Sequence, residues 1–139
     1  MNREDLYVSL WGRRFYPSRL KLRGGVVVTH AADRGEIGTR GKYRGKKVPF
    51  GSCHVFPKTN GRKIAFLADH LRRNSRRYKA AGVTHIVFWI LWRGGQGNTE
   101  LTVRELAKLA AARVSLAMDY IWIEEEPNRA PAPTSGTHL

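Results

Sequence analysis

The chain has 139 residues, 25 of them lysine or arginine and 11 aspartate or glutamate, which gives a formal net charge of +14 at pH 7. This length suits one domain, and no apolar run reaches the roughly 18 residues that a transmembrane helix needs. A single cysteine, Cys53, excludes an internal disulfide framework and a zinc site built from several cysteines. The first residues, MNREDLYV, lack the apolar stretch of a secretory signal, so we expect a cytoplasmic protein with no membrane contact.

The positive charge is concentrated in the middle of the chain. Residues 31–80 hold 14 basic and three acidic side chains, a net +11, whereas the rest of the chain holds 11 and eight. A local excess of positive charge is the expected footprint of a polyanionic partner. A basic surface that is merely solvated is the plainer alternative.

Three segments in the first half of the chain have the side-chain pattern of β-strands. Apolar and polar side chains alternate over residues 6–11, residues 26–30 are almost all β-branched, and residues 50–56 read FGSCHVF. After the first of these, Ser18, just past Pro17, opens at most a single helical turn over residues 19–22. We therefore expect three strands, separated by turns and by one long loop.

The long loop covers residues 31–47 and has no apolar period that would bury it. Its centre, GTRGKYRGKK, holds three glycines and five basic residues around a single tyrosine. Glycine and charge at this density are typical of a solvated loop or a loose hairpin.

Residues 62–81 predict the longest helix, because apolar side chains recur there at helical spacing with arginines on the opposite side. Phe66 falls on the polar side, and it fits only if a neighbouring loop covers it. Asp69 lies one turn before Arg73 and is able to form an ion pair with it.

A second helix is predicted to begin at Thr102. Thr102 and Glu105 form a capping box, in which each side chain bonds the backbone N–H of the other residue. Val103, Leu106 and Leu109 follow at a spacing that predicts one buried apolar face, in a helix that ends near residue 113.

Two more strands flank this second helix. Residues 83–92, VTHIVFWILW, are almost all apolar, which is typical of a strand that is buried on both faces in the middle of a sheet. Residues 114–123 alternate instead, and we expect the side of this strand that carries Leu116, Met118 and Tyr120 to face the core.

Together these elements predict one small α+β domain over residues 1–126. We expect a mostly antiparallel sheet of about five strands, with two helices packed on it, in the order β-β-β-α-β-α-β. Residues 127–139 are rich in proline, alanine, serine and threonine and lack apolar anchors, so they are predicted to form a disordered tail.

The C-terminal half carries a G-x-x-N-x-E-L segment, a helix with spaced leucines and a strand with an Asp-Tyr step, at Gly95, Asn98, Glu100, Leu101, Leu106, Leu109, Asp119 and Tyr120. The N-terminal stretch YVSLWGRRFYPSRL adds an opening strand and an aromatic-Pro-x-x-Leu step. These features resemble a bacterial family known as domain of unknown function 4279, over roughly residues 1–22 and 62–123. The resemblance implies a compact α+β fold and implies no activity.

No group of residues in the sequence has the pattern of a catalytic, metal or cofactor site. Cys53 and His54 are neighbours on a predicted strand, so their side chains point to opposite faces and cannot act as nucleophile and base. His30 and Asp33 have no second histidine at ligand spacing. The Gly94–Gly97 turn lacks the lysine and hydroxyl residue of a phosphate-binding loop, so we interpret it as a structural turn. We expect no enzyme activity and no cofactor.

Two basic clusters remain as candidate polyanion-binding sites. They are the loop residues Arg40, Lys42, Tyr43, Arg44, Lys46 and Lys47 and the helix residues Arg72, Arg73, Arg76 and Arg77. Arginine binds phosphate bidentately, and a tyrosine in the loop is able to stack on a base. The sequence therefore predicts a non-enzymatic basic binding module for nucleic acid or another polyanion. The alternative is a protein-interaction or inhibitor module, of the kind that phages or mobile elements encode, which docks on an acidic protein surface.

Overall fold

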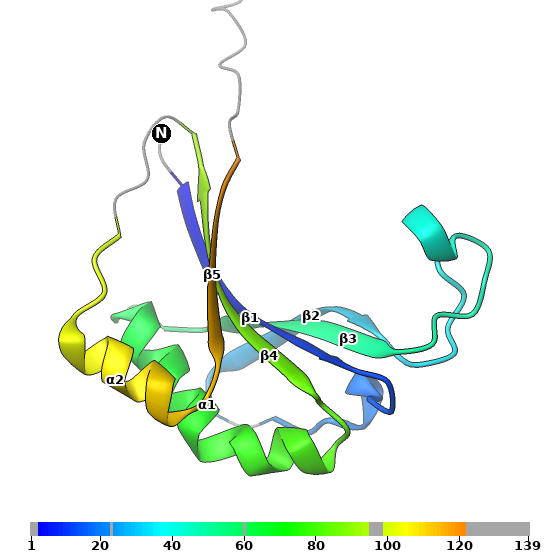
Figure 1. Cartoon of the computed structure of the whole chain (residues 1–139), viewed down its shortest axis with the longest axis horizontal. Coiled ribbons are helices and arrows are strands. Elements are labelled where there is room, and N and C mark those ends of the chain that lie inside the picture. Colours follow the sequence, from blue (N-terminus) through cyan, green and yellow to red (C-terminus); the bar gives the residue numbers. More distant parts are fainter. Residues whose placement is uncertain (1–2, 23, 60, 95–98, 122–139) are drawn as a thin grey trace, which may run out of the picture.

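The protein is described here by a computed structural model of residues 3–22, 24–59, 61–94 and 99–121. Most of the Gly94–Gly97 turn and the predicted tail lie outside these ranges. The described residues form five strands and two α-helices, which confirms the predicted α+β fold (Figure 1). In chain order these elements are β1 (Arg3–Gly12), β2 (Val26–Ala32), β3 (Gly51–Pro57), α1 (Lys63–Ala80), β4 (His85–Arg93), α2 (Val103–Ala111) and β5 (Ser115–Ile121).

The strands form one mixed sheet in the order β2-β3-β1-β4-β5. The pairs β2–β3, β3–β1 and β1–β4 are antiparallel, and only β4–β5 is parallel. The parallel pair follows from the connection between these strands, because a helical crossover returns the chain to the same end of the sheet. β4 lies between β1 and β5, so the prediction that its apolar run lies inside the sheet is confirmed.

Both helices lie on the same side of the sheet (Figure 1). Side chains at every second position of the strands enter the core on that side, where α1 covers them. The fully buried members include Val8, Leu10, Cys53, Val55, Phe88 and Ile90 from the strands and Leu67, Leu71 and Tyr78 from α1.

The prediction that β4 is buried on both faces is wrong. Phe88 and Ile90 point into the core, whereas Val87 and Trp89 lie on the opposite face of the sheet and are only half-buried. No described helix packs on that opposite face, which we call the open face. The run is continuously apolar because its open-face positions hold apolar residues too, and one of them, Trp89, lies beside Tyr7 of β1.

The side of β5 that carries Leu116, Met118 and Tyr120 does lie on the helix side of the sheet, but it is exposed, so its predicted burial is wrong. Met118 is 59% exposed, because β5 is an edge strand and α2 packs chiefly on α1. The predicted buried face of α2 is also wrong. Val103 is 84% and Leu106 is 46% exposed, whereas Leu109 is buried as expected. The side of α2 that faces α1 is instead the one that carries Glu105, whose buried carboxylate pairs with Arg62 just before α1.

Two expectations for α1 had different outcomes. Phe66 is half-buried, and a neighbouring loop does cover it, since a Cβ at Gly25 would lie 3.3 Å from its ring. Asp69, however, pairs with Lys108 of α2 at 3.0 Å. Arg73 reaches only the backbone oxygen of Asp69, so the predicted ion pair within α1 is wrong.

Candidate functional site

A cluster of aromatic and histidine rings covers the middle of the open face. Tyr7 of β1 is its centre, with ring centroids of His54, Phe56 and Trp89 at 4.7, 5.1 and 6.4 Å. His30 of β2 lies 4.9 Å from His54 and completes what we call the ring cluster. The planes of Phe56 and Trp89 are within 24° and 13° of the Tyr7 plane, so the cluster presents nearly parallel rings.

The ring cluster is positioned by strand register. Tyr7 is directly opposite Trp89 in the β1–β4 pair, and Val8 is opposite Val55 in the β1–β3 pair. His54 and Phe56, which flank Val55 on β3, therefore lie on the open face beside Tyr7. Their neighbours along each strand enter the core, so the ring side chains must face the other way. Apart from the exposed His30, each ring is half-buried, and Tyr7 is stacked with both Phe56 and Trp89.

Partial burial favours the uncharged forms of two members of the ring cluster, His54 and Tyr7. Partial burial, with a smaller contribution from His30, holds the pKa of His54 below its ordinary value. Partial burial also raises the pKa of the Tyr7 phenol, against an opposing effect of Arg93. Neutral rings suit stacking on other planar groups, because they do not have to lose a charge's hydration shell.

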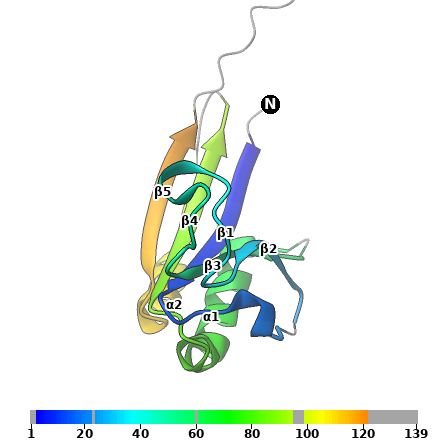
Figure 2. The same ribbon diagram turned by 90° about the vertical axis from the view of Figure 1, so that its right-hand side faces the viewer.

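Residues 33–50, between β2 and β3, leave the sheet on the side opposite the helices, and we call them the excursion (Figures 1 and 2). The sequence predicted either a solvated loop or a loose hairpin for this region, and the structure shows the hairpin. Val48 donates to Glu36 and Gly38 donates to Lys46, both at 2.8 Å, and Ile37 forms an isolated bridge with Lys47. The excursion therefore holds its basic side chains on an ordered backbone.

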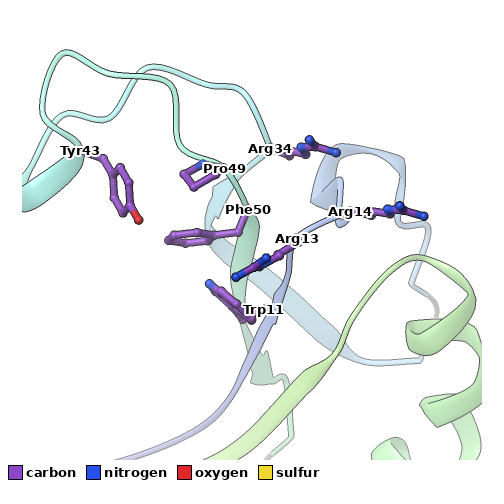
Figure 3. A pocket seen from close by; sticks show the side chains of 7 residues that line it. All are labelled: Trp11, Arg13, Arg14, Arg34, Tyr43, Pro49 and Phe50. Atoms are coloured by element: carbon purple, nitrogen blue, oxygen red, sulfur yellow. The ribbon is translucent and has the colours of Figure 1, made fainter.

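A pocket of about 560 Å³ lies where the excursion meets the end of β1 (Figure 3). Trp11 and Phe50 have ring centroids 5.1 Å apart, and Tyr43 stands edge-on to Phe50 at 5.7 Å. These three rings line one side of the pocket, and the Arg14 and Arg34 side chains lie on the side away from them. Arg13 and Pro49 complete the lining of what we call the arginine pocket.

Close backbone contacts fix the walls of the arginine pocket. A Cβ on Gly12 would lie 2.0 Å from the Gly82 carbonyl oxygen, and a Cβ on Gly51 would lie 1.9 Å from the Phe15 carbonyl oxygen. Only glycine allows the turn after β1 to approach β3 and the end of α1 so closely. Asp33 further ties this turn down, because its carboxylate accepts hydrogen bonds from the backbone and hydroxyl of Ser18.

The two predicted basic clusters lie in different places. The excursion cluster, Arg40, Lys42, Arg44, Lys46 and Lys47, is exposed, and Tyr43 is half-buried in the arginine pocket with the Lys42 ammonium 5.5 Å from its ring. The helix cluster, Arg72, Arg73, Arg76 and Arg77, is also exposed, yet α1 lies on the other side of the sheet from the excursion. The structure thus does not bring the two clusters together. It brings the excursion, which includes Arg34, to Arg13 and Arg14, and none of these three arginines was among the predicted site residues.

The remaining reactive side chains have structural roles. Cys53 is fully buried in the core, where desolvation raises the pKa of its thiol to about 12, and His54 points to the open face as predicted. His70 is buried and hydrogen-bonds Tyr78 inside the core. Within the described ranges, no three histidine, cysteine or acidic side chains gather where they could hold a metal ion. None of the helices in this part of the chain is long and apolar enough to cross a membrane.

Comparisons with known proteins identify no relative of this chain. No family model, no curated protein and no solved structure matches it. The resemblance to family 4279 therefore stays a prediction, and the function has to be inferred from the open face, the excursion and the arginine pocket.

Proposed function

We propose that the protein is a non-enzymatic binding module that holds single-stranded nucleic acid across the open face of its sheet. The observation that carries this proposal is the ring cluster, because it leaves several neutral, nearly parallel rings uncovered beside a strongly basic excursion. A monomeric soluble domain rarely leaves such a row of rings uncovered without a ligand.

Stacking accounts for the choice of a single strand. Each base that stacks on an aromatic side chain contributes about 1–3 kcal/mol, and any base presents a suitable π-face. Tyr7, Phe56 and Trp89 are spaced along three adjacent strands, so successive bases are able to find successive rings. In a duplex the base faces are already stacked on each other and are not accessible to this surface.

Electrostatics supports a defined location for the phosphate backbone. The excursion carries six basic side chains and two acidic ones, Asp33 and Glu36, on the side of the molecule that the open face occupies. The far end of the open face carries Asp5 and Asp119. The phosphates are therefore attracted to the excursion end, and the helix cluster on α1 lies outside the proposed surface.

The test is fluorescence anisotropy with labelled mixed-sequence oligonucleotides, single-stranded and duplex, over a salt series. We expect single strands to bind more tightly, with log K falling linearly with log salt by roughly one unit for each phosphate contact. Replacing the excursion cluster Arg40, Lys42, Arg44, Lys46 and Lys47 by glutamine should flatten this slope without changing the melting temperature. Trp89→Leu should weaken single-strand binding about tenfold or more, because it removes one stacked base.

Tyr120→Ala is the matched control for loss of an exposed ring, since Tyr120 is on β5 and on the helix side of the sheet. This variant should bind as the unmodified protein does. Absence of single-strand binding at low salt would refute the proposal, and binding to acidic proteins under the same conditions would then favour the protein-interaction alternative.

A further inference from the structure

The arginine pocket has features that stacking along the open face does not require. We propose that it binds the phosphorylated end of a nucleic-acid strand, with the terminal base against the rings and the terminal phosphate monoester at the arginines. This inference rests on the proposed function, because the strand that ends in the pocket is the one that lies on the open face.

The ring side of the pocket fits a planar base. Trp11, Phe50 and Tyr43 come from β1, from the residue before β3 and from the excursion, and all three are half-buried with part of each ring facing the pocket. The planes of Trp11 and Phe50 are inclined by 46°, and those of Tyr43 and Phe50 by 80°. Rings at such angles form a corner that contacts both the face and the edge of an inserted ring.

The opposite side of the pocket fits a doubly charged anion. Arg14 and Arg34 lie on that side, and Arg13 lies beside the Trp11 and Phe50 rings (Figure 3). All three arginines are exposed, and no carboxylate is among the lining residues. Asp33, the acid next to Arg34, is already bonded to Ser18. A phosphate monoester carries about −1.5 to −2 charges at pH 7, which is more than the single charge of an internal phosphodiester, and guanidinium groups bind it bidentately.

The position and size of the pocket fit a strand end. Trp11 and Tyr7 are on the same face of β1, four residues or about 13 Å apart, so the pocket lies within reach of the ring cluster along the direction of β1. It lies where β1 ends and the turn of Arg13 and Arg14 begins. Its volume of about 560 Å³ is in the range of pockets that enclose one small ligand such as a nucleotide.

The experiment compares three labelled single strands of the same sequence, of about ten nucleotides. One carries hydroxyl groups at both ends, one a 5′-phosphate and one a 3′-phosphate, so that the two possible sources of a terminal monoester are distinguished. We expect the unmodified protein to bind one phosphorylated strand about tenfold more tightly than the hydroxyl strand at near-physiological salt, because the monoester forms charge-assisted hydrogen bonds with the arginines.

The variants are read by the affinity ratio of phosphorylated to hydroxyl strand, which separates the pocket from general charge effects. Arg14→Gln/Arg34→Gln should reduce the ratio to about twofold or less, because the specific phosphate contacts are lost. Arg72→Gln/Arg76→Gln removes the same charge from exposed positions on α1 and should keep the ratio near ten. Both side-chain pairs are exposed, so neither substitution should unfold the protein.

Three outcomes would overturn the inference. Equal binding of all three strands by the unmodified protein would refute the pocket assignment and leave the proposed function standing. A preference that survives Arg14→Gln/Arg34→Gln would mean that the terminal phosphate binds elsewhere. Failure to bind any of the strands would contradict the proposed function as well.

Discussion

Glu105 offers the sharpest stability test, because its buried carboxylate joins the starts of both helices. Arg62 donates to Glu105 through Nε and Nη2, each at 2.6 Å, and the Thr102 backbone N–H donates to Glu105 at 2.9 Å. The Arg62 hydrogen bonds are the main cause that lowers the pKa of Glu105 to about 2, against the opposing effect of burial. Glu105→Gln isolates the charge, since glutamine still supports a capping box but carries none.

The magnitude follows from the pKa and from the exposure of the partner. A decrease in the pKa of Glu105 from 4.5 to about 2 would correspond to roughly 3 kcal/mol of stability at neutral pH. The Arg62 side chain is 54% exposed, so solvent screens the pair, and we expect Glu105→Gln to cost about 1–2 kcal/mol. Because the folded-state pKa is below the unfolded one, this contribution is complete above about pH 4.5 and is lost as the pH falls toward 2.

Urea denaturation at a series of pH values measures both effects. The difference in unfolding free energy between the unmodified protein and Glu105→Gln should be constant from pH 7 to about pH 5 and should shrink below it. Glu100→Gln is the control, because the Glu100 side chain is exposed and only its backbone oxygen accepts from Arg62. Equal stability of Glu105→Gln and the unmodified protein at pH 7, or a difference that does not change with acidity, would refute this account of the pair.

Three further predictions concern the core and the backbone contacts. Leu71→Asp should unfold the domain, seen by circular dichroism, because it buries an unpaired charge under the sheet, and a cooperative melt would contradict the assigned core. Gly12→Ala should cost about 2 kcal/mol or more in urea denaturation, since its Cβ would meet the Gly82 carbonyl at 2.0 Å, whereas Gly61→Ala should be tolerated. The thiol of Cys53 should react with a thiol reagent only after unfolding, because burial keeps it protonated and inaccessible; rapid labelling of the native protein would argue against this.

Local patterns in the sequence were enough to locate the five strands and two α-helices of the described residues, but not the short 3-10 helix at Gly41–Tyr43. The alternation of residues 6–11, the helical spacing of residues 62–81 and the capping box at Thr102 each act within one element, so they are visible without tertiary information. Which side of α2 faces α1 was not predictable in this way. It depends on the pair of Arg62 and Glu105, which are 43 residues apart in the chain.

The open face was misread for a related reason. Tyr7 and Trp89 occupy alternate positions in strands whose other positions are apolar, and an aromatic residue at such a position is usually covered by the core. Only the placement of both helices on one side of the sheet shows that these rings stay uncovered. The aromatic residues that alternate with core residues in β1, β3 and β4 were the only sequence signal for the ring cluster.

The arginine pocket had no such signal in the sequence, because Arg13, Arg34 and Tyr43 come from separate turns that meet only in the fold.

The central claim, that the strand lies on the open face, is tested most directly by ultraviolet crosslinking. A short single strand of thymidines would be irradiated with the unmodified protein, and the crosslinked peptides would be sequenced by mass spectrometry. The ring cluster predicts crosslinks at Tyr7, Phe56 and Trp89. Crosslinks confined to peptides of α1, on the other side of the sheet, would contradict it.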